Sequence, residues 1–145
     1  MKESLRKFII LAAASIFLSG CAATVVSSVG PNTDLKSLKN FYVVRSPDDN
    51  RGVDTAIQLQ LASMGLKATS GTDFSRPKDV DVIVTYKHNW VWDITWYLLD
   101  LIIQFRDPQT NVLIASGQSY RSSLVRREPA FMAKEVLDSI FKTGS

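Results

Sequence analysis

Residues 79–107 read DVDVIVTYKHNWVWDITWYLLDLIIQFRD and contain two long alternating patterns. From Val80 to Trp92 the apolar side chains recur at even positions, and most odd positions are polar. A period of two over this length predicts a β-strand with one apolar face. From Tyr97 to Phe105 the strongly apolar residues occupy odd positions. The change of parity predicts a tight turn or bulge between two antiparallel strands.

The segments before this pair of strands alternate between strand and helix. Residues 41–46 (FYVVRS) are aromatic and β-branched, which predicts a strand. Residues 51–64 carry apolar side chains at helical spacing, and Gly65 stands where a left-handed helix cap is expected. Residues 66–70 (LKATS) predict a further short strand.

The segments after the pair add a turn, a strand and a helix. Residues 107–111 (DPQTN) predict a turn, because Pro108 fixes φ and Asp107 can cap the backbone. A strand over 112–123 and a helix over 128–142 follow, with Pro129 in the first turn of the helix. The order β-α-β-β-β-β-α over residues 39–145 predicts one two-layer α+β domain. In it, two helices pack on one face of a mainly antiparallel sheet.

The N-terminus has the pattern of a secretory signal peptide over residues 1–20. Lys2, Arg6 and Lys7 make the first residues basic, and residues 8–18 (FIILAAASIFL) are apolar or small apart from one serine. A membrane span needs about 20 apolar residues, so this run is too short for one.

The only cysteine ends this segment in the motif LSGC (residues 18–21), which resembles the lipobox of bacterial lipoproteins. The resemblance implies cleavage between Gly20 and Cys21 and acylation of Cys21, which would anchor the chain to a lipid bilayer. One acyl chain anchors only marginally, while two or more hold firmly at about 0.8 kcal/mol per buried methylene. Ala22 in the next position implies sorting to the outer membrane, facing the periplasm. An ordinary signal peptide with a stray cysteine is the alternative.

Cleavage changes the charge that matters for partners. It leaves 125 residues and lowers the net charge from +3 to +1, because three of the 17 basic and one of the 14 acidic residues are removed. We therefore expect no nucleic-acid partner. Residues 21–38 mix Ser, Gly, Pro and Asn without a sustained period, which predicts a lipidated N-terminus and a tether. The alternative is that Val25, Val26 and Val29 dock onto the domain.

The sequence offers few groups for catalysis. The only histidine, His88, lies on the apolar parity of its strand, where a structural role is the commoner one. No metal-ligand spacing, nucleophile motif or phosphate-binding loop occurs. We expect no catalytic residue, metal or cofactor, so the chain is not predicted to be an enzyme. A hydrolase-like site around His88 is a lesser alternative.

The better candidate for function is an apolar surface beside the predicted turn, since two helices cover only one face of a sheet. All three tryptophans fall within seven residues there. Tryptophan is frequent in the core, in protein-binding hot spots and at membrane surfaces, and all three roles stay open. The candidate partner-binding residues are Trp90, Val91, Trp92, Trp96, Leu98 and Ile102.

The mature chain as a whole is similar to small bacterial lipoproteins of unknown function. The residues that carry the resemblance are the opening strand at 41–45, LASMG at 61–65 and DVIVTY at 81–86. It implies a non-catalytic envelope lipoprotein that binds another envelope protein or itself. The alternative is a small-ligand or lipid-binding lipoprotein with an apolar pocket lined by Tyr86, Trp90 and Tyr97.

Overall fold

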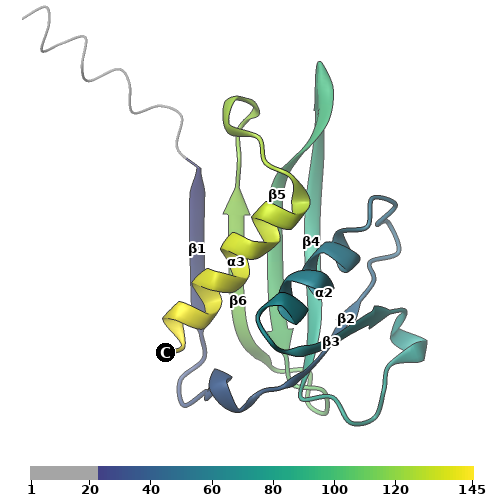
Figure 1. Ribbon diagram of the computed structural model, residues 1–145, viewed down its shortest axis with the longest axis vertical. Coiled ribbons are helices and arrows are strands. Elements are labelled where there is room, and N and C mark those ends of the chain that lie inside the picture. The colour runs from purple at the N-terminus through teal and green to yellow at the C-terminus, as the bar shows by residue number, and fades with distance from the viewer. Residues whose placement is uncertain (1–22) are drawn as a thin grey trace, which may run out of the picture.

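The computed structural model describes residues 23–145 (Figure 1). The predicted signal peptide (residues 1–20) and Cys21 lie outside the described residues. No helix of the described part is long and apolar enough to cross a membrane.

Six strands form one sheet in the order β1-β6-β5-β4-β2-β3. Strands β1, β6, β5 and β4 pair antiparallel, whereas β2 pairs parallel with both β4 and β3. Helices α2 and α3 lie on the same face of the sheet (Figure 1). The bounds are β1 Thr24–Val29, β2 Asn40–Val44, α2 Val53–Ser63, β3 Lys67–Gly71, β4 Val82–Asp93, β5 Thr95–Arg106, β6 Leu113–Tyr120 and α3 Pro129–Thr143. The predicted fold class and order of elements are confirmed.

The two helices end and pack as their sequences indicate. Pro129 is the first residue of α3, and Gly65, just after α2, has φ +82°. The apolar face of α3 is fully buried on the sheet, and Gly117 of β6 lies under it. A Cβ atom at Gly117 would lie 2.8 Å from a methyl group of Val136. Only a residue without a side chain allows this close approach of helix and sheet.

The tether predicted over residues 21–38 is wrong for residues 24–29. These residues form β1, which pairs with β6 from Thr24 opposite Tyr120 to Val29 opposite Ala115. Two contacts to the helix layer explain the pairing. Val29 packs against the core, and the Ser27 hydroxyl donates to the backbone carbonyl of Ser139 in α3 over 3.0 Å. The sheet therefore begins three residues after Cys21.

The change of parity between β4 and β5 has two causes. A turn with Ile94 at φ +64° joins the strands, and a register shift follows between Asn89 and Trp90. Asn89 lies opposite Asp100 but Trp90 lies opposite Leu98, so β5 has one extra residue, a β-bulge. The extra residue reverses the alternation of β5. Residues 95–98, between the turn and the bulge, therefore face the other side of the sheet than they would in a regular strand.

Replacing Gly117 by valine tests the contact between α3 and the sheet. Overpacking of this kind costs about 1–3 kcal/mol, so we expect Gly117→Val to lower the free energy of unfolding by that amount in urea denaturation. The matched control is Ser116→Val on the uncovered face, which is expected to stay within about 0.5 kcal/mol of the wild type. Equal effects of the two variants would contradict this packing.

Candidate functional site

The β4–β5 hairpin extends beyond the rest of the sheet. β6 ends at Tyr120, which lies opposite Asp100, and Asp100 lies opposite Asn89. Residues 90–99 of the hairpin therefore extend past the end of β6, as Figure 1 shows at the top of the molecule. We call the part formed by residues 90–98 the hairpin tip.

The hairpin tip carries the three tryptophans in two different environments. Trp92 and Trp96 lie opposite each other with ring centroids 5.8 Å apart in an edge-to-face arrangement, and they are 60% and 52% exposed. Trp90 packs against the core, and its indole N–H has no partner among the described residues. The guanidinium of Arg51 lies 4.6 Å from the centroid of the Trp90 ring and 5.3 Å from that of Trp96. Stacking of a cation on aromatic faces ties the β2–α2 loop to the tip.

Arg126 fastens the hairpin tip to the loop between β6 and α3. Its Nη1 donates to Thr95 Oγ1 over 2.7 Å, and its Nη2 donates to the Asp93 carbonyl over 2.7 Å and pairs with the Asp93 carboxylate at 3.0 Å. Its Nε donates to the carbonyl of Ser123 over 2.9 Å. The guanidinium also lies 4.5 Å from the centre of the Tyr97 ring. One side chain thus holds both residues that flank Ile94.

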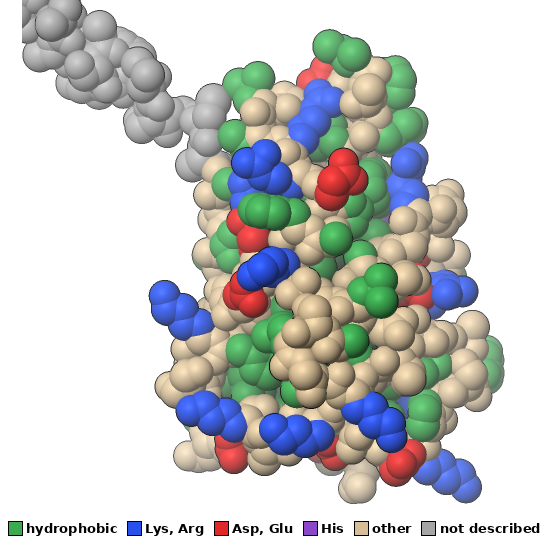
Figure 2. Space-filling view, in the orientation of Figure 1, with side chains coloured by type: hydrophobic (Ala, Val, Ile, Leu, Met, Phe, Trp, Pro, Cys, Tyr) green, Lys and Arg blue, Asp and Glu red, His purple; other side chains and the backbone are tan. Residues whose placement is uncertain are grey.

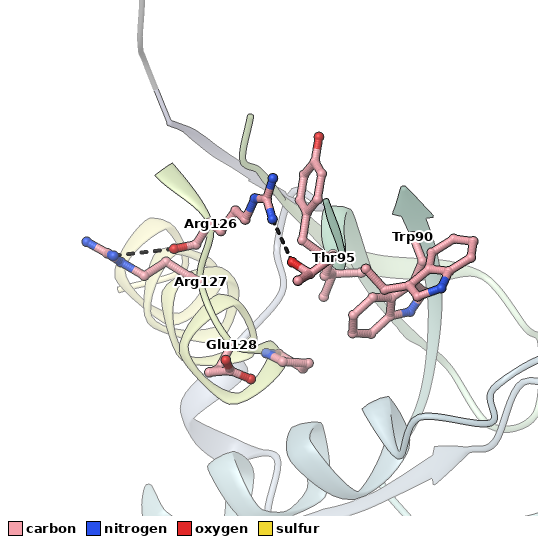
Figure 3. A pocket seen from close by; sticks show the side chains of 9 residues that line it. Trp90, Thr95, Arg126, Arg127 and Glu128 are labelled. Carbon is pink, nitrogen blue, oxygen red and sulfur yellow. Dashed lines mark hydrogen bonds between the residues drawn. The ribbon is translucent and has the colours of Figure 1, made fainter. Parts of the chain in front are cut away.

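A surface depression of about 380 Å³ lies between the tip and the start of α3. Figure 3 shows Trp90 on one side of it and Arg126, Arg127 and Glu128 on the other, with the Arg126 guanidinium directed at Thr95. Two of the polar side chains around it, Arg126 and Thr95, are joined across it in the clamp. The depression therefore lies along the contact between the hairpin tip and the segment that leads into α3.

The six candidate partner-binding residues do not share one face. Trp92 and Trp96 are exposed, and Trp90 lies with them on the helix side of the sheet. Leu98 was predicted to face a partner, but it is 1% exposed and belongs to the core. The bulge explains this error, because it brings Leu98 onto the same face as Leu101. Val91 and Ile102 are half-buried.

The face opposite the helices is more polar than predicted. Ile102 lies opposite Lys87 and Gln118, and Gln118 donates to the Asp100 carboxylate over 2.8 Å. A shallow depression of about 470 Å³ runs over β1, β6 and β5 and is lined by Val26, Ile102 and polar side chains. We call this area the open face.

Tyr86 and His88 belong to a polar cluster at the start of α2. The Tyr86 hydroxyl donates to Asp49 over 2.6 Å and accepts from the backbone N–H of Ser46 over 3.1 Å. Burial, followed by the hydrogen bond to Asp49, raises the pKa of Tyr86 and keeps its hydroxyl protonated. His88 is nearly buried, and its Nε2 lies 3.7 Å from Asp48. A hydrolase-like site around His88 stays a prediction.

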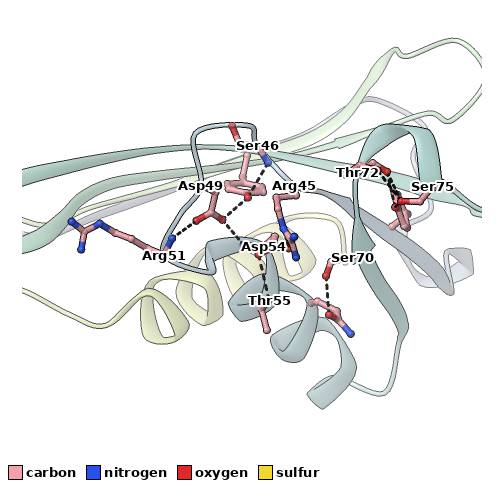
Figure 4. Close-up of polar contacts among 12 residues, drawn as sticks. Arg45, Ser46, Asp49, Arg51, Asp54, Thr55, Ser70, Thr72 and Ser75 are labelled. Carbon is pink, nitrogen blue, oxygen red and sulfur yellow. Dashed lines mark hydrogen bonds and ion pairs between the residues drawn. The ribbon is translucent and has the colours of Figure 1, made fainter.

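Asp49 caps helix α2 (Figure 4). Gly52 at the N-cap position has no side chain, and Asp49 accepts from the backbone N–H groups of Arg51 over 2.9 Å and Asp54 over 3.0 Å. Burial alone would raise the pKa of Asp49. The hydrogen bonds from Tyr86 and these two N–H groups outweigh burial and hold the pKa below its ordinary value of 3.8. The cluster thus has a structural use, and Tyr86 and Tyr97 lie on opposite faces of the sheet because of the bulge in β5.

Comparison with known proteins shows a shared fold. No protein-family model and no curated protein matches the sequence. The fold is similar to that of PelC from Paraburkholderia phytofirmans, solved as a dodecamer, with 13% identity, 82% of this chain and 98% of that chain covered, and a TM-score of 0.63. A variant of the same PelC gives 12% identity over 85% and 97% of the chains and a TM-score of 0.58.

A third similar structure comes from a different bacterium. It is a DUF4136 family protein from Bacteroides thetaiotaomicron, with 6% identity, 83% of this chain and 95% of that chain covered, and a TM-score of 0.53. At these identities the likeness extends to the fold alone, and it covers nearly the whole length of the two proteins.

Removing the Arg126 side chain should loosen the hairpin tip. Hydrogen bonds from a charged donor are worth about 1.5–3 kcal/mol each, so we expect amide exchange of residues 92–97 to accelerate about tenfold or more in Arg126→Ala. The matched control is Arg127→Ala, whose guanidinium contacts the Phe131 ring and the Arg126 carbonyl but not the tip. Unchanged exchange in Arg126→Ala would show that the tip does not depend on this clamp.

The Asp49 cap predicts a defined pH dependence of stability. A carboxyl whose folded-state pKa is lowered stabilises the fold above its ordinary pKa, near 3.8, and this contribution is lost as the pH falls through the folded-state value. We expect Asp49→Ala to lower the free energy of unfolding by about 2 kcal/mol at pH 7. The difference from the wild type should shrink below about pH 4. A constant difference from pH 7 to pH 3, or an equal loss in the exposed control Asp79→Ala, would contradict the cap.

Proposed function

We propose that the protein is a non-catalytic envelope lipoprotein, held on the outer membrane by an acylated Cys21, whose domain binds a second copy of itself. The anchor is supported by the N-terminal pattern and by the LSGC motif. The α+β domain follows at once, because β1 begins at Thr24.

The observation that carries the interaction is the uncovered part of the sheet. Helices α2 and α3 lie on one face, and on the open face Val26, 51% exposed, and the half-buried Ile102 lie on either side of Gln118. Next to it, β1 is the end strand of the sheet and pairs on one side with β6. Such a strand edge can accept another strand, and a neighbouring flat surface can accept the side chains that come with it.

A second copy is the partner we favour among envelope proteins. The fold is similar to that of PelC, which was solved as a dodecamer. The side chains of the open face are mostly polar or small, including serines and glutamines from three strands. Interfaces between separately folded copies are commonly of this mixed composition. A small-ligand role has less support, because Tyr86 is engaged with Asp49.

The anchor is tested by replacing Cys21. We expect Cys21→Ser to remove the acyl chains from the intact protein mass and to release the protein from the membrane fraction, because the thiol that carries an acyl chain is lost. Ala22→Ser, one position further, is the matched control. It should keep the acyl chains and stay in the membrane fraction. A wild-type protein without acyl chains would contradict the lipoprotein assignment.

The interaction is tested by photo-crosslinking in cells, with the probe placed at Val26 and Ile102 in turn. An adduct of twice the chain mass at both positions is expected, and none from the control position Lys36, which lies exposed in the 3-10 turn Leu35–Ser37. An adduct of another mass would replace the second copy by a different envelope protein. No adduct at either position would show that the open face binds no protein.

A further inference from the structure

The end of the domain that carries the hairpin tip is also the end at which β1 begins. Thr24 lies opposite Tyr120, Tyr120 opposite Asp100, and Asp100 opposite Asn89. Thr24 and Asn89 therefore stand at about the same level of the sheet, and Figure 1 shows β1 starting at the end where the hairpin protrudes. The strand directions thus fix the side of the domain from which the chain leads back to Cys21.

Covalent geometry limits the height of Cys21 above that level. The chain takes three residue steps from Thr24 to Cys21. Since a chain spans at most about 3.6 Å per residue, Cys21 lies at most about 11 Å from Thr24. The rung formed by Trp92 and Trp96 stands three residues beyond Asn89, which at about 3.3 Å per residue is about 10 Å. Cys21 can therefore reach, but not pass far beyond, the height of the two exposed tryptophans, so a bilayer entered by its acyl chains would lie at the level of the tip or overlap it.

The side chains at this end suit the boundary of a bilayer. Beside Trp92 and Trp96, the exposed large apolar residues here are Ile94, Leu124 and Phe131. Ile94 is 84% exposed at the outermost point of the hairpin and has φ +64°. A β-branched residue is disfavoured at such a φ, and an exposed turn gives it no burial in return. In a monomer in water, glycine or asparagine would be more stable at this position.

Arginines lie among these apolar groups. Arg51 stacks on Trp90 and Trp96, and Arg127 lies 5.3 Å from the Phe131 ring. Figure 2 shows green and blue side chains side by side at the top of the molecule. Tryptophan is enriched where lipid headgroups meet hydrocarbon, and a guanidinium is suited to a phosphate oxygen at the same depth.

From these observations we infer that the hairpin tip rests in the headgroup region of the anchoring membrane, with Trp92, Ile94 and Trp96 at the boundary of the hydrocarbon. The inference rests on the proposed acylation of Cys21. It assigns the tip to phospholipid and leaves the open face, which lies along the sheet, for the second copy. The clamp by Arg126 ties the tip to the loop between β6 and α3.

The tryptophans provide the test, because all three lie in the hairpin tip and their emission reports on no other part of the protein. The acylated full chain is purified from membranes and placed in vesicles of phosphatidylethanolamine and phosphatidylglycerol. Half of the vesicles carry bromine atoms near the headgroup end of the acyl chains. With the tip about 5–10 Å deep, we expect bromine to quench about half of the emission.

Matched variants separate contact with lipid from stability. Ile94→Asp is expected to lose most of the quenching, while Val112→Asp, at an exposed site in the turn at the opposite end, is expected to retain it. Ile94→Gly suits the left-handed backbone, so it should keep or raise the melting temperature and still reduce the quenching. This combination distinguishes loss of membrane contact from loss of the fold.

Each further outcome has a defined meaning. Equal emission from brominated and ordinary vesicles, with the acylated protein bound to both, would overturn the inference and leave the anchor intact. A shift of the emission to shorter wavelength without quenching would overturn it in favour of a protein covering the tip. A purified chain without acyl groups would contradict the proposed function and remove the starting point of this inference.

Discussion

The pairing of β4 with β5 is the interaction on which the rest of the structure depends. These two strands are the longest in the sheet, and they join its antiparallel half to its parallel half. Their length exceeds that of β6, so their far ends cannot be covered by the remainder of the sheet. The bulge opposite Asn89 and Trp90 then lets Leu98 enter the core while Trp92 and Trp96, two rungs further out, stay in contact with solvent. One irregularity thus separates the packed part of the hairpin from the part that is presented outward.

Much of the fold could be predicted from local signals. The alternation in residues 80–92, the helical spacing before Gly65 and Pro129 at the start of the last helix each reflect a backbone preference or a period of burial. Those signals need no knowledge of the neighbouring strand, and the order of the elements followed from them. The position of the tryptophans beside a turn could be recognised for the same reason.

The errors concern contacts between distant residues. The residues of β1 carry three serines or threonines among six, and nothing local indicates that the strand pairs with β6. Leu98 was placed on the wrong face because one extra residue in β5 reverses the parity, and the change of parity in the sequence does not tell a turn from a bulge or place the extra residue at Leu99. Arg126 was not predicted as a clamp, because its partners Asp93 and Thr95 are more than thirty residues away. In the sequence Arg126 stands with Arg121 and Arg127 beside a turn, and such a group of arginines is normally a solvated surface.

The position of β1 also bears on when this strand pairs, relative to the proposed acylation of Cys21. Its partner strand lies more than eighty residues further along the chain, so we expect this pair to close after the more local pairs of the sheet. Until then residues 24–29 are not held by the sheet, and an enzyme that carries out the proposed acylation of Cys21 would meet a chain that is not yet tied to β6. Once β6 is in place, the same residues become a fixed edge. Late pairing of β1 with β6 would then separate the proposed acylation of Cys21 from completion of the sheet.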